Sequence, residues 1–102
     1  MNMQNLLKQA QKMQKELTKM EDTLKEQTYE STMGGGVVKV EVTGNMEITN
    51  IELADDIIDV EAKEDLQEMI KAAVNDALKK ATEDKEKQMN ALTGGIKMPG
   101  GF

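Results

Sequence analysis

The first 24 residues carry an apolar repeat in which spacings of three and four residues alternate. A 3.5-residue repeat is typical of a helix that packs along its whole length against another helix. At 1.5 Å per residue the repeat is roughly 32 Å long, and so short a chain can hardly cover it with its own residues. We therefore expect a second copy to cover it. We predict a homodimer whose interface consists of Met3, Leu6, Met13, Leu17, Met20 and Leu24.

The core that this chain can build is small and aliphatic. Its 102 residues include two aromatic side chains, Tyr29 and Phe102, and nine methionines. Aromatic residues usually supply much of the core volume, so Val, Ile, Leu, Met and Ala must fill this one. One core is only just adequate for a domain of this size, which is a second reason to expect an oligomer.

The chain contains neither Cys nor His. This excludes disulfides, thiol and imidazole catalysis and the usual zinc sites. The hydroxyl and amine groups lack a recognisable catalytic context, so we expect no enzymatic activity, no cofactor and no small-molecule substrate. No apolar run approaches the ~20 residues that span a bilayer, and the N-terminus lacks the apolar stretch of a signal peptide. We therefore expect a soluble cytoplasmic protein with no membrane partner.

The residue pattern predicts an α+β fold with a single α-β-β-β-α domain at 1–93. Good helix formers dominate the N-terminal segment, and alternation of apolar and polar residues marks the strands. The alternation slips by one residue in the last strand, and a β-bulge near Thr49-Asn50 would restore one apolar face. We predict helices at 2–27 and about 61–92, and strands at 28–33, 37–43 and 46–53.

The connections also have recognisable patterns. Gly34-Gly35-Gly36 predicts a tight turn, because no Lys-Ser/Thr follows it as in a phosphate-binding loop. Gly44-Asn45 predicts a two-residue hairpin. The acidic connector 54–61 does not match the calcium-binding helix–loop–helix spacing, so we expect solvated acids and no metal site. We expect the Gly-rich tail 94–102 to be mobile, unless Met98 or Phe102 docks on a partner.

Charge is distributed unevenly along the chain. The net charge is −6, yet residues 1–20 carry +3, whereas residues 41–68 carry −9. All thirteen basic residues are lysines, and without Arg any nucleic-acid contact should be mainly to phosphate. The lysines of the first helix lie away from the apolar repeat, which suits either a solvated helix face or a phosphate-binding ridge. Lysines on the second helix extend this ridge but are interspersed with Glu83, Asp84 and Glu86.

Four segments carry a resemblance to a known family. They are Gly34-Gly35-Gly36-Val37-Val38-Lys39-Val40, Ala72-Ala73-Val74-Asn75-Asp76-Ala77-Leu78-Lys79-Lys80-Ala81, the Gln/Met/Lys-rich first helix and the ending Thr93-Gly94-Gly95…Pro99-Gly100-Gly101. In their order and spacing, these segments together resemble the YbaB/EbfC nucleoid-associated family. The resemblance covers essentially the whole chain. It implies a bacterial, cytoplasmic, tweezer-like homodimer that binds double-stranded DNA through long projecting helices and associates with the nucleoid.

Residues and resemblance together indicate a nucleoid-associated protein that contacts DNA phosphates with little sequence specificity. By charge and helix position, the candidate DNA-binding residues are Lys8, Lys12, Lys15, Lys19, Lys79, Lys80, Lys85 and Lys87. The alternative is a dimeric protein–protein adaptor associated with DNA repair or replication machinery.

Overall fold

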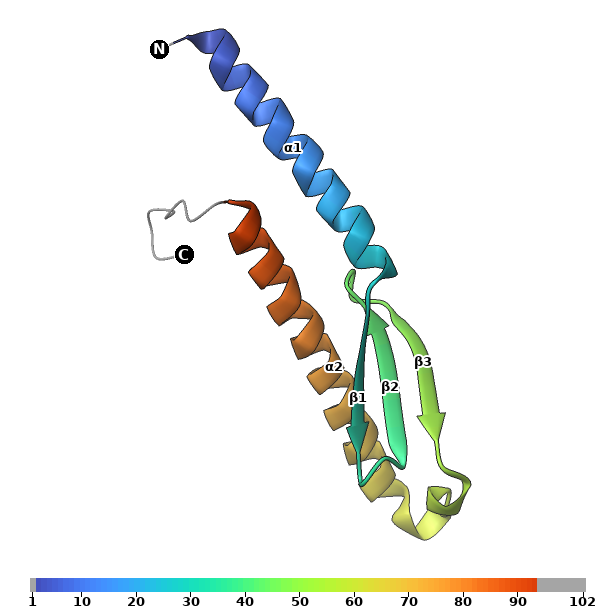
Figure 1. The fold of residues 1–102 in the computed structure, drawn as a ribbon. Helices are drawn as coiled ribbons and strands as arrows, with labels where there is room; N and C mark the ends of the chain where they lie inside the picture. Colours follow the sequence, from blue (N-terminus) through green and yellow to red (C-terminus); the bar gives the residue numbers. More distant parts are fainter. Residues whose placement is uncertain (1, 94–102) are drawn as a thin grey trace.

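The structure is a computed structural model that describes residues 2–93, so the predicted tail at 94–102 lies outside the described residues. The order of elements confirms the predicted α-β-β-β-α fold (Figure 1). The helices and strands are α1 (Met3–Glu26), β1 (Thr28–Met33), β2 (Val38–Thr43), β3 (Ile48–Leu53) and α2 (Lys63–Leu92). Two short 3₁₀ turns, Asp55–Ile57 and Val60–Ala62, form the acidic connector.

The two helices run antiparallel, and both extend beyond the same end of the sheet (Figure 1). The molecule is therefore elongated, with extents of 69 × 27 × 16 Å. The N-terminal half of α2 packs on the sheet, while its C-terminal half rises beside α1. The N-terminal part of α1 extends beyond the end of α2 and forms a projecting arm.

Both ends of α1 have identifiable partners. The side chain of Asn2 accepts a hydrogen bond from the amide of Gln4 at 2.9 Å, which caps the helix N-terminus. At the other end, the amide of Gly44 donates to the carbonyl oxygen of Leu24 at 2.9 Å. A helix leaves its last four carbonyls without intrahelical partners, and the loop between β2 and β3 supplies a donor to one of them.

The sheet is an antiparallel meander in the order β1-β2-β3. Glu41 pairs with Asn50, whereas its neighbour Val42 pairs with Ile48, so Thr49 is an extra residue on β3. This register shift confirms the predicted bulge. Because of it, Ile48 and Ile51 both lie on the same face of the sheet as the valines of β2.

The hairpin between β2 and β3 differs from the prediction. A two-residue loop and a strand from Met46 were expected, but the amide of Thr43 donates to the carbonyl of Glu47 at 2.8 Å and β3 starts at Ile48. The loop therefore has three residues, and Met46 takes the left-handed conformation with φ 67°. Gly44 is needed for another reason: a Cβ there would lie 2.5 Å from the carbonyl oxygen of Leu24.

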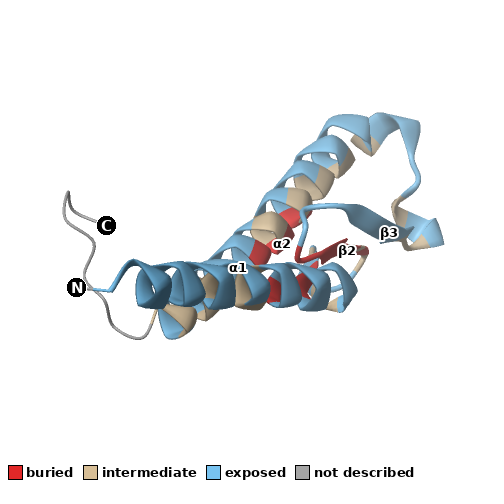
Figure 2. Cartoon of the chain, turned by 90° about the horizontal axis from the view of Figure 1, so that it is seen from above, coloured by how far each residue is buried: buried red, intermediate tan, exposed pale blue. Residues whose placement is uncertain are grey.

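The core lies between α2 and the first two strands. Buried valines of β2 meet buried alanines of α2, whose small side chains let the helix approach the sheet closely (Figure 2). The fully buried members are Val38, Val40, Val42, Ala73, Ala77 and Ala81. One helix about 10 Å wide cannot cover three strands spaced about 4.8 Å apart. The side chains of Ile48 and Ile51 on β3 consequently remain 45% and 44% exposed.

Candidate nucleic-acid interface

Four predicted lysines form a single row on α1: Lys8, Lys12, Lys15 and Lys19. At 100° per residue they fall within about 60° of one another around the helix axis, and the row is about 17 Å long. All four residues are exposed. We call this set the lysine row. Lys8, Lys12 and Lys15 lie on the part of α1 that projects beyond α2, whereas Lys19 also lines a hollow beside the end of α2.

None of the four lysines forms an ion pair within 4.0 Å to any residue in the range 2–93. Lysines elsewhere do have acidic partners: Lys25 lies 3.8 Å from Asp22, and Lys71 lies 3.5 Å from Glu68. The charge of the lysine row is therefore available to an external anion. The lysine row differs in this respect from lysines such as Lys25 and Lys71, which have acidic partners.

The predicted lysines of α2 do not extend the row uniformly. Lys80 lies 3.5 Å from Asp76 and donates to the carbonyl oxygen of Glu30 at 2.9 Å, so it is engaged in holding α2 on β1. Lys79, Lys85 and Lys87 are exposed, but successive rotations of about 600° and 200° place them on different sides of the helix. The structure thus groups the four lysines of α1 and disperses those of α2.

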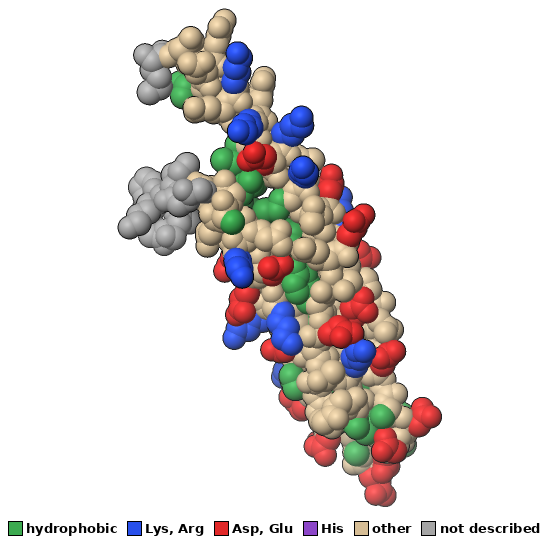
Figure 3. Space-filling view, in the orientation of Figure 1, with side chains coloured by type: hydrophobic (Ala, Val, Ile, Leu, Met, Phe, Trp, Pro, Cys, Tyr) green, Lys and Arg blue, Asp and Glu red, His purple; other side chains and the backbone are tan. Residues whose placement is uncertain are grey.

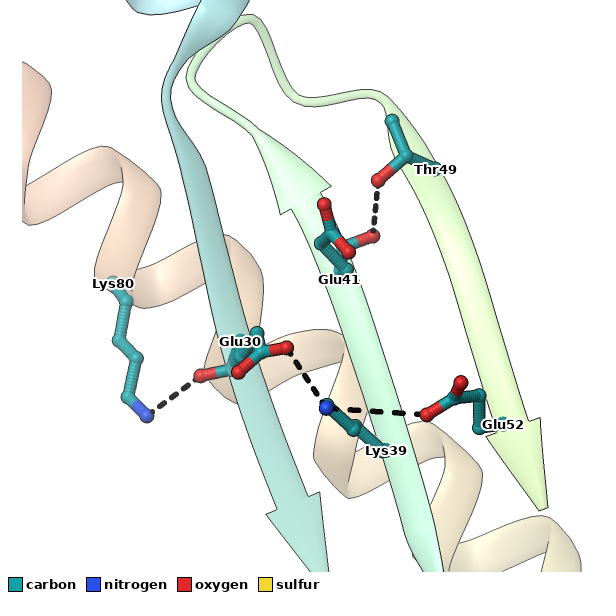
Figure 4. A network of polar contacts seen from close by, with 6 residues as sticks. All are labelled: Glu30, Lys39, Glu41, Thr49, Glu52 and Lys80. Atoms are coloured by element: carbon teal, nitrogen blue, oxygen red, sulfur yellow. Dashed lines mark hydrogen bonds and ion pairs between the residues drawn. The ribbon is translucent and has the colours of Figure 1, made fainter.

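Basic and acidic side chains occupy opposite ends of the molecule (Figure 3). Lysines gather on the upper part of α1, whereas the connector and the start of α2 are acidic. The outer face of the sheet is also acidic: Lys39 lies 3.1 Å from Glu30 and 3.9 Å from Glu52, and these carboxylates raise its pKa (Figure 4). A polyanion should therefore be repelled by the sheet and attracted to the arm.

A polar cluster holds α2 against the junction of α1 and β1. The hydroxyl of Tyr29 donates to Asp84, and the side-chain amide of Gln88 donates to both Asp84 at 2.9 Å and Gln27 at 3.0 Å. Desolvation of the phenol, followed by its contact with Asp84, raises the pKa of Tyr29 to about 12. The cluster links residues 55 positions apart in the chain. Sequence reasoning missed it, although Tyr29 as the only tyrosine in a strand-forming segment was a usable signal.

A second polar contact lies further toward the N-terminal end of α2. The hydroxyl of Ser31, buried in β1, donates to Asp76 at 2.7 Å. This hydrogen bond, together with the nearby charge of Lys80, lowers the pKa of Asp76. Asp76 therefore accepts from Ser31 and pairs with Lys80, which ties it to structure rather than to a ligand.

The predicted dimer seam is divided by the fold. Met20 and Leu24 are buried within the chain at 9% and 2% exposure, and Met13 and Leu17 are half-buried. Met3 and Leu6, on the projecting arm, are 74% and 44% exposed. Only the N-terminal part of the seam is thus a free surface.

The part of the chain that the structure describes offers no membrane span and no metal cluster. Neither helix within 2–93 is long and apolar enough to cross a membrane. Over the same residues, no group of three or more acidic side chains is arranged to hold a metal ion.

The fold and the lysine row together define a class: a small α+β protein with a projecting helical arm that carries exposed lysines. Residues 1–96 match the YbaB/EbfC DNA-binding family, and the chain belongs to that family.

Similar proteins agree with this assignment. The chain is 48% identical to a nucleoid-associated protein of Pelotomaculum thermopropionicum over 99% of its length and 96% of the relative. It is 45% identical to a nucleoid-associated protein of Clostridium novyi, covering 100% of this chain and 90% of that one. The family description and the names of these bacterial relatives together indicate a nucleoid-associated DNA-binding protein rather than an enzyme.

The fold also matches a solved structure. The crystal structure of an uncharacterized protein from Helicobacter pylori superimposes with a TM-score of 0.84 at 28% identity. The match covers 92% of this chain and 99% of that one, so the two proteins share the complete α-β-β-β-α arrangement.

Proposed function

We propose that this protein binds double-stranded DNA through the lysine row of α1, mainly by contacts to phosphates. The observation that carries the proposal is that Lys8, Lys12, Lys15 and Lys19 are exposed, lie on one side of a projecting helix and have no acidic partner within the described residues. A row about 17 Å long corresponds to about half a turn of B-DNA. It can therefore meet several phosphates at once.

Lysine ammonium groups recognise phosphate as point charges and lack the fork with which Arg reads guanine. We therefore propose binding with little sequence specificity. Each phosphate contact contributes about −0.9 to the slope of log K against log salt, so four lysines correspond to a slope of roughly −4. Two copies of the row in a homodimer would approach roughly −7.

We further propose that the protein is a homodimer and that the uncovered face of β3 is its main contact. Ile48 and Ile51 continue the buried valine layer of β2, but no helix within residues 2–93 covers them. A second copy would cover them. This proposal moves the main dimer contact from the seam on α1 to β3, because Met20 and Leu24 of the seam already pack inside the chain.

The DNA proposal is tested by fluorescence anisotropy with a labelled duplex at a series of salt concentrations. The variant with all four lysines of the row changed to Gln should bind more weakly, and its slope should be shallower by about 0.9 for each phosphate that it no longer neutralises. Its matched control changes Lys25, Lys39, Lys63 and Lys71 to Gln, which removes the same charge elsewhere and should retain most of the slope. Equally weakened binding by the two variants would show that only net charge matters and would overturn the assignment to α1.

We also propose that the protein associates with the nucleoid in the bacterial cytoplasm. A fluorescent fusion should overlap the DNA stain, and the fusion carrying the four Gln substitutions should spread through the cytoplasm. Unchanged overlap would argue that another surface brings the protein to the nucleoid.

A further inference from the structure

The acidic connector carries two exposed apolar side chains, Ile58 and Val60. They are 60% and 88% exposed, so they lie outside the core formed within residues 2–93. Together with Leu66 they line a hollow of about 250 Å³ whose surface is mostly apolar, and Val60 also borders a second hollow of about 270 Å³. We call Ile58 and Val60 the connector end, because the connector forms the extremity of the molecule opposite to the N-terminus of α1 (Figure 1).

Carboxylates surround the connector end. Figure 3 shows apolar side chains among acidic ones at this extremity. The six acidic residues of the segment 54–65 are all exposed, and the five ion pairs found within residues 2–93 include none of them. They are Asp55, Asp56, Asp59, Glu61, Glu64 and Asp65. Six acids against Lys63 give this segment a net charge of −5. A partner that covers the connector end should therefore be both apolar and basic.

The beginning of α1 has this complementary composition. Met3, Leu6 and Leu7 are 74%, 44% and 59% exposed, and they lie within about 100° of one another around the helix axis. We call these three residues the arm tip. The charged residues at positions 2–15 are three lysines of the lysine row, so this stretch carries a charge of +3. The arm tip is therefore an apolar surface on a basic segment.

We propose that the arm tip of one copy docks on the connector end of another copy. Both surfaces are apolar, and the segments that carry them have opposite charge. Since they lie at opposite ends of a molecule 69 Å long, the contact joins two copies rather than two parts of one chain. A contact between two different surfaces of the same protein is heterologous. Each pair keeps one free arm tip and one free connector end, so further copies can add.

The size of the contact sets its strength. The molecule is 27 × 16 Å across its long axis, so an end-on contact stays below the ~800 Å² per partner of a standard interface. The association is therefore weak and transient, and the opposite charges support it most at low salt. Each residue of the arm tip lies at least about 100° from the middle of the lysine row, so docking leaves most of the row open. The inference does not depend on DNA binding, since its test contains no nucleic acid.

Sedimentation velocity at increasing protein concentration tests this contact. The sedimentation coefficient of the natural protein should keep rising with concentration at low salt, and added salt should reduce the rise. Leu7→Ser changes the arm tip, and a double variant with Ile58→Ser and Val60→Ser changes the connector end. Each variant should raise the concentration at which association appears by roughly tenfold or more, because the contact loses a large apolar side chain.

A mixture of the two variants should associate again. Leu7→Ser keeps its connector end and the double variant keeps its arm tip, so one intact contact can form between them. The matched control is Gln14→Ser, an exposed residue on the same side of α1 as Leu7 but about 10 Å further along the helix, which should associate like the natural protein. Circular dichroism should show the same helix content for all of these proteins, because every substituted side chain is exposed.

Three results would overturn the proposal. The first is a sedimentation coefficient of the natural protein that reaches a plateau at one small assembly even at high concentration and low salt. The second is a mixture of the two variants that fails to associate, because a heterologous contact requires only one intact surface from each partner. The third is Leu7→Ser that associates like the natural protein, because the connector end would then bind another surface. Loss of the proposed β3 dimer in Ile51→Glu should leave the end-on contact intact, so the two proposals can fail separately.

Discussion

The amide of Gly44 donates a hydrogen bond of 2.9 Å to the carbonyl oxygen of Leu24, joining the β2–β3 hairpin to the last turn of α1. The hairpin loop thus approaches the helix backbone directly, and there is no room for a side chain between them. Leu24 itself is only 2% exposed. This contact fixes the point from which α1 leaves the sheet and therefore the direction of the arm that carries the lysine row.

Gly44→Ala should destabilise the protein. The added Cβ would lie 2.5 Å from the carbonyl oxygen of Leu24, and overpacking of this kind costs about 1–3 kcal/mol. Urea unfolding followed by circular dichroism measures the change in the free energy of unfolding. Gly35→Ala is the control, because its Cβ meets nothing within 4 Å and the change costs only the strain of a positive φ, about 1–2 kcal/mol. If Gly44→Ala stabilised the protein, the close approach would not exist in solution.

Tyr29→Phe should lower the free energy of unfolding by about 1 kcal/mol at pH 7, because it removes the hydrogen bond to Asp84. The effect should depend on pH. Folding raises the pKa of Tyr29 from 10.0 to about 12, so its stabilising contribution is complete below pH 10 and is lost as the pH rises from 10 to 12. The difference between the two proteins, followed by urea unfolding from pH 8 upward, should therefore shrink above pH 10. A constant difference would mean that the phenol is not preferentially protonated in the folded state.

A comparison of Lys80→Gln with Lys12→Gln should distinguish a lysine that stabilises the fold from one that binds DNA. Lys80 is held by Asp76 and by the carbonyl of Glu30, so its replacement should reduce stability by less than about 1 kcal/mol and leave the salt slope of DNA binding unchanged. Lys12→Gln should have the reverse effect: unchanged stability and a slope shallower by about 0.9 for each row that contacts DNA. Anisotropy and thermal unfolding on the same two variants provide the comparison. A shallower slope for Lys80→Gln would place DNA on α2 as well.

Ile51→Glu should weaken the homodimer, because the charge would lie in the middle of the proposed contact on β3. Sedimentation velocity over a range of concentrations measures the shift from dimer to monomer. Leu6→Glu tests the alternative contact on the α1 seam and should leave the dimer intact. If Leu6→Glu dissociated the dimer and Ile51→Glu did not, the interface would lie on the α1 seam. If the natural protein were a monomer, the homodimer proposal would be wrong.

Much of the fold was predictable because local patterns decide it. Alternating valines placed β2, and the slip in apolar spacing after Ile48 predicted the bulge at Thr49. The hairpin was less predictable, because Gly44 is required by a contact with Leu24 that is distant in the chain rather than by its own φ angle. The left-handed residue is instead Met46, which no turn preference would select.

The lysine row was also a local property, since a spacing of four, three and four residues on one helix places Lys8 to Lys19 on one side whatever else the chain does. Whether these lysines are free to bind an external anion is not a local property. Whether a lysine is free or paired depends on which elements pack against it, and Lys80 could be recognised as structural only once α2 was placed on β1.

By itself, the sequence determined the elements, their order and the two-sided character of α1, because helix and strand periodicity act over a few residues. Only the tertiary structure decided which apolar residues are covered. One helix spans about two strands, so β3 remains exposed within residues 2–93. Because α2 ends at Leu92, beside the middle of α1, the N-terminal part of α1 is also exposed among these residues, whereas Met20 and Leu24 are buried. That division depends on the relative lengths and positions of α1, α2 and the sheet, which no local pattern contains.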